Sequence, residues 1–284
     1  TNAQSNLDSL TKQADELAKK IDPNATGWQD ALKGLDSKRF KTSKEALEHH
    51  KKTSQETLEY MKTKGFAPAD TKDVKVVEDP KNIGTGAYVD NETGNFNVET
   101  ADRESDIYLP FTAKSVSIHE LVHAVDHQNN GISDNPLSEG LAYYVEEKAY
   151  AEGDFYKTDE EKLLALKWQI VRNVRVLVTS KLHNNEMTSK EAETYLIDKT
   201  KISPKQAKAE VAIMLESPLQ MISYVGGAEG IKVLWKKIQE KDPKMTHADF
   251  LKKLYDTNEK SPRKISDVAE QLFGISLEET DVYK

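Results

Sequence analysis

Hydrophobic positions along the chain recur mostly with the three- and four-residue spacing of amphipathic helices. Residues 43–63 and 159–182 predict two long helices, and several shorter ones follow residue 187. Helix-start signatures support these boundaries, with a hydroxyl or carboxylate side chain three positions before an acidic residue. They occur at Thr42/Glu45, Thr158/Glu161, Thr188/Glu191, Thr246/Asp249 and Asp267/Glu270, and Ser203 followed by Pro204 marks one more start.

Only residues 74–112 show the pattern of β structure. Short strands at 87–89 and 96–98 flank the turn-forming segment 90–95, which predicts a hairpin. The expected fold class is therefore mainly α with a small β-sheet or hairpin. Because no linker interrupts the later part of the chain, we expect an N-terminal helical extension over residues 1–40 and one domain over 41–284.

The composition excludes several classes of protein. The 284 residues carry 40 basic and 48 acidic side chains, so a net charge of -8 argues against a nucleic-acid partner. The absence of cysteine excludes disulfides and thiolate metal sites. No apolar run approaches the roughly 18 residues of a transmembrane span. The small polar residues at 1–6, which do not start with Met, favour an exported protein (periplasmic, cell-surface, secreted or lipid-anchored), with a cytoplasmic one as the alternative.

The strongest chemical signal is a His-Glu-x-x-His motif at residues 119–123. His119 and His123 lie four residues apart, so a helix places both imidazoles on one face, where they can bind one zinc ion. Glu120 lies about 100° around that helix and can accept a proton from water. His127 continues the spacing but lies about 12 Å along the axis from His119, too far to share the ion.

A catalytic zinc site needs a third protein ligand and an open fourth position. Glu139 is the predicted third ligand, and Glu146 on the same helical face is the rival candidate. Gly131 and Pro136 permit the chain to reverse before this helix. The predicted cofactor is therefore one Zn²⁺ bound by His119, His123 and Glu139.

These motifs resemble those of known metallopeptidases. The His-Glu-x-x-His motif followed by Glu-Gly-Leu-Ala-x-Tyr at 139–144 resembles the gluzincins, whose third zinc ligand is a Glu on a later helix. A longer resemblance is to the bacterial zincin-like family called domain of unknown function 885, which carries a Glu-Gly-Trp-Ala-Leu-Tyr-Ala-Glu string. Segments at 172–192 and 217–226 also resemble that family, and the resemblance spans roughly residues 40–275. One departure is that family members have Pro-Gly-His-His where residues 123–126 read His-Ala-Val-Asp.

The resemblance implies further roles. A zincin-like fold is expected, and His183 and Tyr224 are candidates to stabilise an oxyanion, as His or Tyr does in related peptidases. In gluzincin-like folds an edge strand pairs with the substrate backbone, and the candidate here is Phe96, Asn97 and Val98. Arg172 and Arg175 lie on a helix that is apolar almost all round, so they are expected to be buried. Either they pair with carboxylates such as Glu146, Glu147 or Asp126, or one of them binds a substrate carboxylate.

The sequence as a whole predicts a zinc metallopeptidase that cleaves a peptide or protein substrate, with Glu120 as the general base. Two alternatives stay open. One is a non-catalytic exported binding protein or lipoprotein with a vestigial or structural zinc site. The other is a metal-dependent hydrolase of non-peptide amides or esters, because the zinc and water chemistry is shared.

Overall fold

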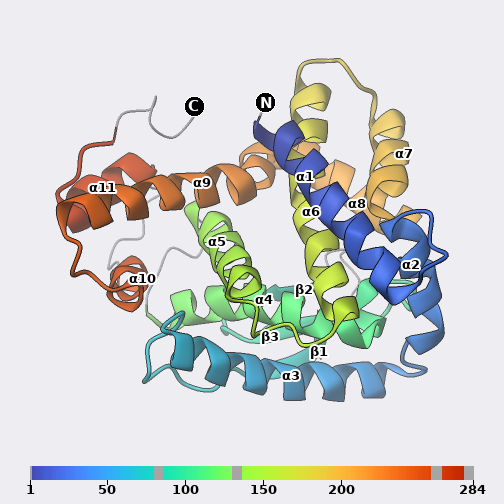
Figure 1. Cartoon of the computed structure of the whole chain (residues 1–284), viewed down its shortest axis with the longest axis horizontal. Coiled ribbons are helices and arrows are strands. Elements are labelled where there is room, and N and C mark those ends of the chain that lie inside the picture. Colours follow the sequence, from blue (N-terminus) through green and yellow to red (C-terminus); the bar gives the residue numbers. More distant parts are fainter. Residues whose placement is uncertain (1, 80–85, 130–135, 257–263, 278–284) are drawn as a thin grey trace.

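A computed structural model describes residues 2–79, 86–129, 136–256 and 264–277 (Figure 1). The structure is mainly helical with one small sheet, which confirms the expected fold class at this level. The helices are α1 (Asn2–Ile21), α2 (Trp28–Leu35), α3 (Ser43–Lys64), α4 (Ala113–Gln128), α5 (Pro136–Glu152), α6 (Asp159–His183), α7 (Ser189–Thr200), α8 (Pro204–Glu216), α9 (Pro218–Lys241), α10 (His247–Tyr255) and α11 (Ile265–Phe273). Three 3₁₀ turns, η1 (Asp36–Lys38), η2 (Asp106–Tyr108) and η3 (Pro110–Thr112), and strands β1 (Val76–Asp79), β2 (Ala87–Val89) and β3 (Phe96–Glu99) complete it.

Most helices begin where the capping signatures predict. The side chains of Thr42, Thr158 and Thr188 accept hydrogen bonds from backbone N–H groups three residues later, and each forms a full capping box. Ser203 and Thr246 cap their helices in the same way. The helix start predicted at Asp267 is wrong, because α11 begins after Lys264 and Asp267 lies inside its first turn.

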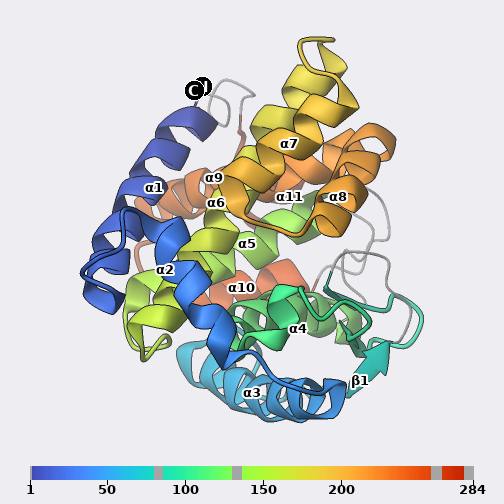
Figure 2. The same cartoon turned by 90° about the vertical axis from the view of Figure 1, so that its right-hand side faces the viewer.

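The sheet has the strand order β1-β3-β2. β2 and β3 form the predicted antiparallel hairpin, and β1 pairs with β3 in parallel. Phe96 and Val98 of β3 are fully buried and form a small core with Ile107. In both views α3 runs along one side of the molecule beside α4 and the strands (Figures 1 and 2).

Helix α4 is held in the core by one apolar face. Ile118, Leu121, Val122 and Val125 are fully buried, as their helical spacing predicts. α4 packs against α3 on one side and against α5 and α6 on the other. The opposite face of α4 is therefore free to carry polar side chains without exposing the core.

Two further packing features position the neighbouring helices. α1 lies along α6, and its Leu7, Ala14 and Leu17 side chains belong to the same core as α6. α5 and α9 approach closely at Gly140, where an added Cβ would lie 2.5 Å from Cα of Gly227. None of the helices in the described part of the chain is long and apolar enough to cross a bilayer.

Candidate metal centre

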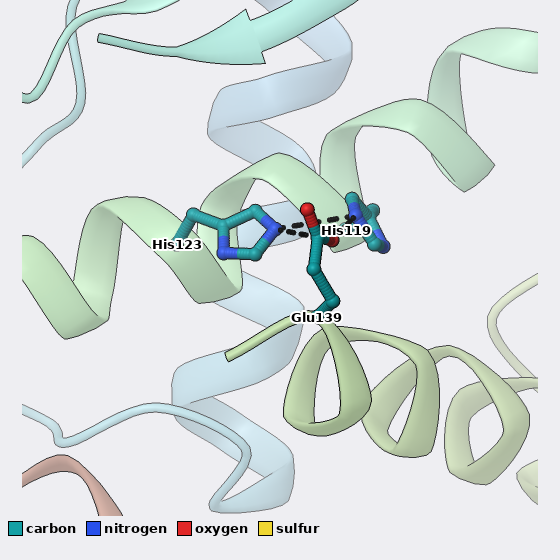
Figure 3. Close-up of side chains that lie close together, drawn as sticks. All are labelled: His119, His123 and Glu139. Carbon is teal, nitrogen blue, oxygen red and sulfur yellow. Dashed lines mark hydrogen bonds and ion pairs between the residues drawn. The ribbon is translucent and has the colours of Figure 1, made fainter. Parts of the chain in front are cut away.

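Three side chains converge between α4 and the start of α5 (Figure 3). Nε2 of His119 lies 3.2 Å from Nε2 of His123. The Oε2 atom of Glu139 lies 3.2 Å from Nε2 of His119 and 3.3 Å from Nε2 of His123. The structure thus brings the three predicted ligands together.

The spacing of these donor atoms fits a zinc ion. Zinc binds imidazole nitrogen and carboxylate oxygen at about 2.0–2.1 Å, so two ligands of a tetrahedral ion lie about 3.3 Å apart. The three separations here are 3.2, 3.2 and 3.3 Å. Two imidazoles and one carboxylate are also the donor set of open, catalytic zinc sites rather than of closed structural ones.

Each ligand is held from its other side by a polar neighbour. Oε1 of Glu146 lies 2.5 Å from Nδ1 of His119, and Oγ of Ser138 lies 3.0 Å from Nδ1 of His123. The side-chain amide of Gln220 on α9 donates to Oε1 of Glu139 at 3.1 Å. Glu146 therefore contacts the rear nitrogen of His119, in the position of an orienting partner, and leaves Nε2 facing Glu139 and His123.

The electrostatics of the cluster favour a cation at its centre. Although burial lowers the pKa of His119, the carboxylates of Glu146 and Glu139 raise it to about 9. Burial raises the pKa of Glu139, but His123 and His119 hold it well below its usual range. The carboxylates thus favour a positive charge beside them.

Glu120 lies beside the cluster on α4 and lines the same cleft. Its side chain has no hydrogen-bond partner in the part of the chain that the structure describes, and the residue is only 8% exposed. Burial raises the pKa of Glu120, while the two histidines oppose that rise. A buried, unpaired carboxyl group next to the donor atoms is suited to exchange protons with water.

Tyr224 of α9 forms part of the cleft wall next to His119. The two rings stack with centroids 5.8 Å apart and planes 18° apart. Burial and the charge of Glu139 keep the pKa of Tyr224 well above its usual value. The phenol therefore stays protonated and can donate a hydrogen bond into the cleft.

Both predicted arginines are buried, and both are paired with carboxylates. Arg172 donates to Glu146 at 2.6 Å, and Arg175 forms a two-pronged pair with Glu210 at 2.8 and 2.5 Å. Both line the cleft, but their charges are already matched. The structure thus shows the carboxylate pairing that was one of the two expectations. The other, that one of the arginines binds a substrate carboxylate, stays a prediction, because Nε and Nη1 of Arg172 have no hydrogen-bond partner among the described residues.

A family model and two solved structures relate this molecule to known proteins. The family model described as "Bacterial protein of unknown function (DUF885)" matches residues 1–254. The chain belongs to the DUF885 family. No curated protein sequence matches it.

Two solved structures are similar to this DUF885 protein over 95% of its chain. One is "the putative lipoprotein from Colwellia psychrerythraea", with a TM-score of 0.77 and 16% identity. The other is "a putative lipoprotein of unknown function from Shewanella oneidensis", with a TM-score of 0.72 and 17% identity. The present chain covers 50% and 55% of those chains, so it spans about half of their length, and the likeness concerns the fold.

His183 does not belong to the site of this DUF885 protein. Its ring nitrogen Nε2 lies 2.9 Å from the backbone oxygen of Met214, and the residue is exposed at the end of α6. Arg172, which reaches His119, lies eleven residues earlier, so His183 is about 16 Å further along the helix. The predicted oxyanion role of His183 is wrong for this reason. His127 also lies apart, with Nε2 3.2 Å from the backbone oxygen of Asn91.

The predicted substrate strand is also corrected. Phe96, Asn97 and Val98 lie in β3, the central strand, whose backbone is paired on both sides. β2 is an edge strand, and residues 86–89 line the cleft. The hairpin was predicted correctly, but its other strand faces the site.

The cleft has a volume of about 530 Å³ and is lined by β2, α4, the start of α5, α6, α8 and α9.

Three members of the site were not predicted from the sequence, namely Ser138, Gln220 and Glu210. Ser138 precedes the predicted ligand, and Gln220 lies in a segment that resembles the family, so both had a local signal. Glu210 had none, because only the packing of α8 against α6 brings it to Arg175. Gly131, expected to permit the reversal before α5, lies outside the described residues.

Proposed function

We propose that this protein is a zinc-dependent hydrolase, and specifically a metallopeptidase. The observation that carries the proposal is the set of three donor atoms, 3.2 to 3.3 Å apart, with the carboxyl group of Glu120 in the same cleft. His119, His123 and Glu139 would hold the ion. Bound zinc would supply a Lewis acid that polarises the scissile carbonyl and lowers the pKa of water to about 7.

The chain's own residues supply the remaining steps. Glu120 accepts a proton from the attacking water on its carboxylate and passes it to the leaving amine nitrogen. The hydroxyl of Tyr224 donates a hydrogen bond to the carbonyl oxygen as negative charge develops there. Glu146 and Ser138 keep the two imidazoles in orientation from behind.

A peptide substrate is favoured by the edge of the sheet that lines the cleft. β2 lines the cleft and, among the described residues, pairs with β3 on one side only. An extended peptide can add to such an edge through main-chain hydrogen bonds. An ester or a small amide has no extended backbone to pair in this way, so the peptidase is preferred over the other hydrolases.

The test is cleavage of denatured casein and of a mixed peptide library by the purified, zinc-loaded protein. We expect cleavage that stops on addition of a chelator and returns with zinc. Glu120→Gln should bind zinc but lose cleavage, whereas Glu147→Gln, on α5 and paired with Lys232, should keep it. Cleavage that survives both the chelator and Glu120→Gln would remove the mechanism.

The competing function is an exported lipoprotein in which the metal site is structural. The two similar solved structures are both described as putative lipoproteins, which supports an exported, lipid-anchored location for this chain. In that case zinc removal would lower the thermal unfolding temperature, and neither the wild type nor Glu120→Gln would cleave any peptide.

A further inference from the structure

One wall of the cleft is apolar and begins one helical turn before His119 on α4. It is formed by Val89 of β2, Val116 of α4 and Trp168 of α6, all of which are half-buried and line the cleft. Val116 precedes His119 by three residues, so both side chains project from the same face of α4. Trp168 likewise precedes Arg172 by one turn on α6.

Two contacts hold the part of α6 that carries Trp168 against the part of α4 that carries Val116. The indole Nε1–H of Trp168 donates to Oγ1 of Thr112 at 3.3 Å, and one turn later Arg172 reaches Nδ1 of His119 at 3.2 Å. The two helices therefore run side by side, and Val116 lies on α4 between Thr112 and His119. The indole N–H thus lies beside Thr112, seven residues or about 10 Å along α4 before His119, and the wall runs from there past Val116 toward His119.

The wall has a firm apolar backing and carries no charge. Val89 and Val116 pack against a small core that contains Ile107 and Ala87, which are 2% and 9% exposed. Among the described residues, those that line the cleft from β2, from η2 and from α4 before His119 are all uncharged. A charged group placed against this wall would lose water, whereas a flat or branched apolar group would gain contact with the indole.

We propose that this wall is the subsite for a bulky apolar side chain, aromatic or branched aliphatic, next to the bond that is cleaved. The proposal rests on the proposed peptidase function and deepens it by naming the substrate class. Peptides with Phe or Leu at this position are preferred, and those with Asp are excluded.

A binding experiment tests the subsite without requiring turnover. The probes are the blocked peptides acetyl-Ala-X-Ala-amide, with X as Phe, Leu, Ala or Asp, titrated into zinc-loaded Glu120→Gln protein by calorimetry. We expect the Phe and Leu peptides to bind at least about tenfold more tightly than the Ala peptide, the range for added apolar groups in a hydrophobic pocket. The Asp peptide should bind most weakly.

Two variants of the wall and one matched control locate the preference. Trp168→Ala and Val116→Asn should each reduce the difference between Phe and Ala peptides to less than about threefold. Trp235→Ala removes another half-buried tryptophan, which packs against His247 and Phe250 and does not line the cleft, so it should keep the full preference. Equal binding of the four peptides, or a preference that survives both wall variants, would overturn the subsite.

Failure of the subsite and failure of the peptidase proposal give different results. If the wild type cleaves a peptide library with no enrichment of apolar residues beside the cleaved bond, the subsite is wrong and the peptidase stands. If the peptides bind with the expected preference but nothing is cleaved, the wall is an apolar binding site and the peptidase is wrong.

Discussion

Glu139 and Glu146 share one face of α5, yet they contact opposite nitrogens of His119. Glu139 lies 3.2 Å from Nε2, and Glu146 lies 2.5 Å from Nδ1. The imidazole ring thus lies between the two carboxylates. This geometry favours Glu139 over Glu146 as the third ligand, because Glu139 faces the space that His123 also faces.

At this residue scale, Tyr224→Phe tests the proposed contact with developing charge. Removal of the hydroxyl should lower kcat for peptide cleavage by about 10²–10³, the usual loss for one oxyanion donor. Zinc affinity should stay unchanged, because the ring still stacks on His119. Steady-state kinetics and a zinc titration on the same preparation check both parts. An unchanged kcat would show that Tyr224 only packs.

The convergence of the three candidate ligands could be predicted because its signal is local. His119 and His123 are separated by one helical turn, and Glu139 lies in the first turn of the next helix, although periodicity alone left Glu146 as a rival. His183 was assigned from resemblance, without any local measure of its distance from the metal, and it was wrong. Glu210 is invisible in the sequence because its role depends on α8 packing across Arg175.

At the scale of elements, the contact between α5 and α9 sets the position of Glu139. An added Cβ at Gly140 would lie 2.5, 2.7 and 2.9 Å from backbone atoms of Gly227 and Ala228. The helices can therefore approach only because residue 140 has no side chain. Gln220, which holds Glu139, lies on the same helix as Gly227.

Gly140→Ala should therefore push α5 from α9 and lower the free energy of unfolding by about 1–3 kcal/mol. Gly226→Ala is the matched control in α9, where an added Cβ meets nothing within 4 Å. That control should be neutral or stabilise by up to about 1 kcal/mol, because alanine favours helix over glycine. Urea denaturation of both variants makes the comparison. Equal effects would mean that the close contact does not limit the packing.

Helix boundaries were predictable because capping depends on three or four neighbouring residues, as at Thr42 and Thr158. The hairpin was predictable for the same reason. The strand order was not, since the parallel pairing of β1 with β3 joins residues that lie about twenty positions apart. That pairing places β3 in the centre of the sheet and leaves β2 at the edge beside the cleft. The substrate strand predicted from the sequence was therefore the wrong strand of the hairpin.

At the scale of the whole molecule, His50 couples stability to pH. It is fully buried in α3, and its Nε2–H donates to the backbone oxygen of Ile107 at 3.0 Å. Burial lowers the pKa of His50 from 6.5 to about 4. Between these values the unfolded chain binds a proton that the folded chain does not, so stability is lost as the pH falls.

His50→Gln keeps an N–H donor for Ile107 but cannot titrate. Between pH 7 and pH 4.5 the wild type should lose about 2–3 kcal/mol more unfolding free energy than this variant, at 1.36 kcal/mol per pKa unit. Urea denaturation of both proteins at the two pH values gives the difference. Equal losses of unfolding free energy in the wild type and His50→Gln would show that His50 does not stay neutral in the folded protein.

The central claim is that His119, His123 and Glu139 hold one zinc ion, and competition titration against a chromophoric chelator tests it most directly. The wild type should bind one zinc per chain, and Glu139→Ala should weaken binding most. Glu146→Ala, which removes only the orienting partner, should cost about 10–100-fold, and Glu147→Ala should change little. No stoichiometric zinc in the wild type, or a loss at Glu146 equal to or greater than the loss at Glu139, would contradict the account.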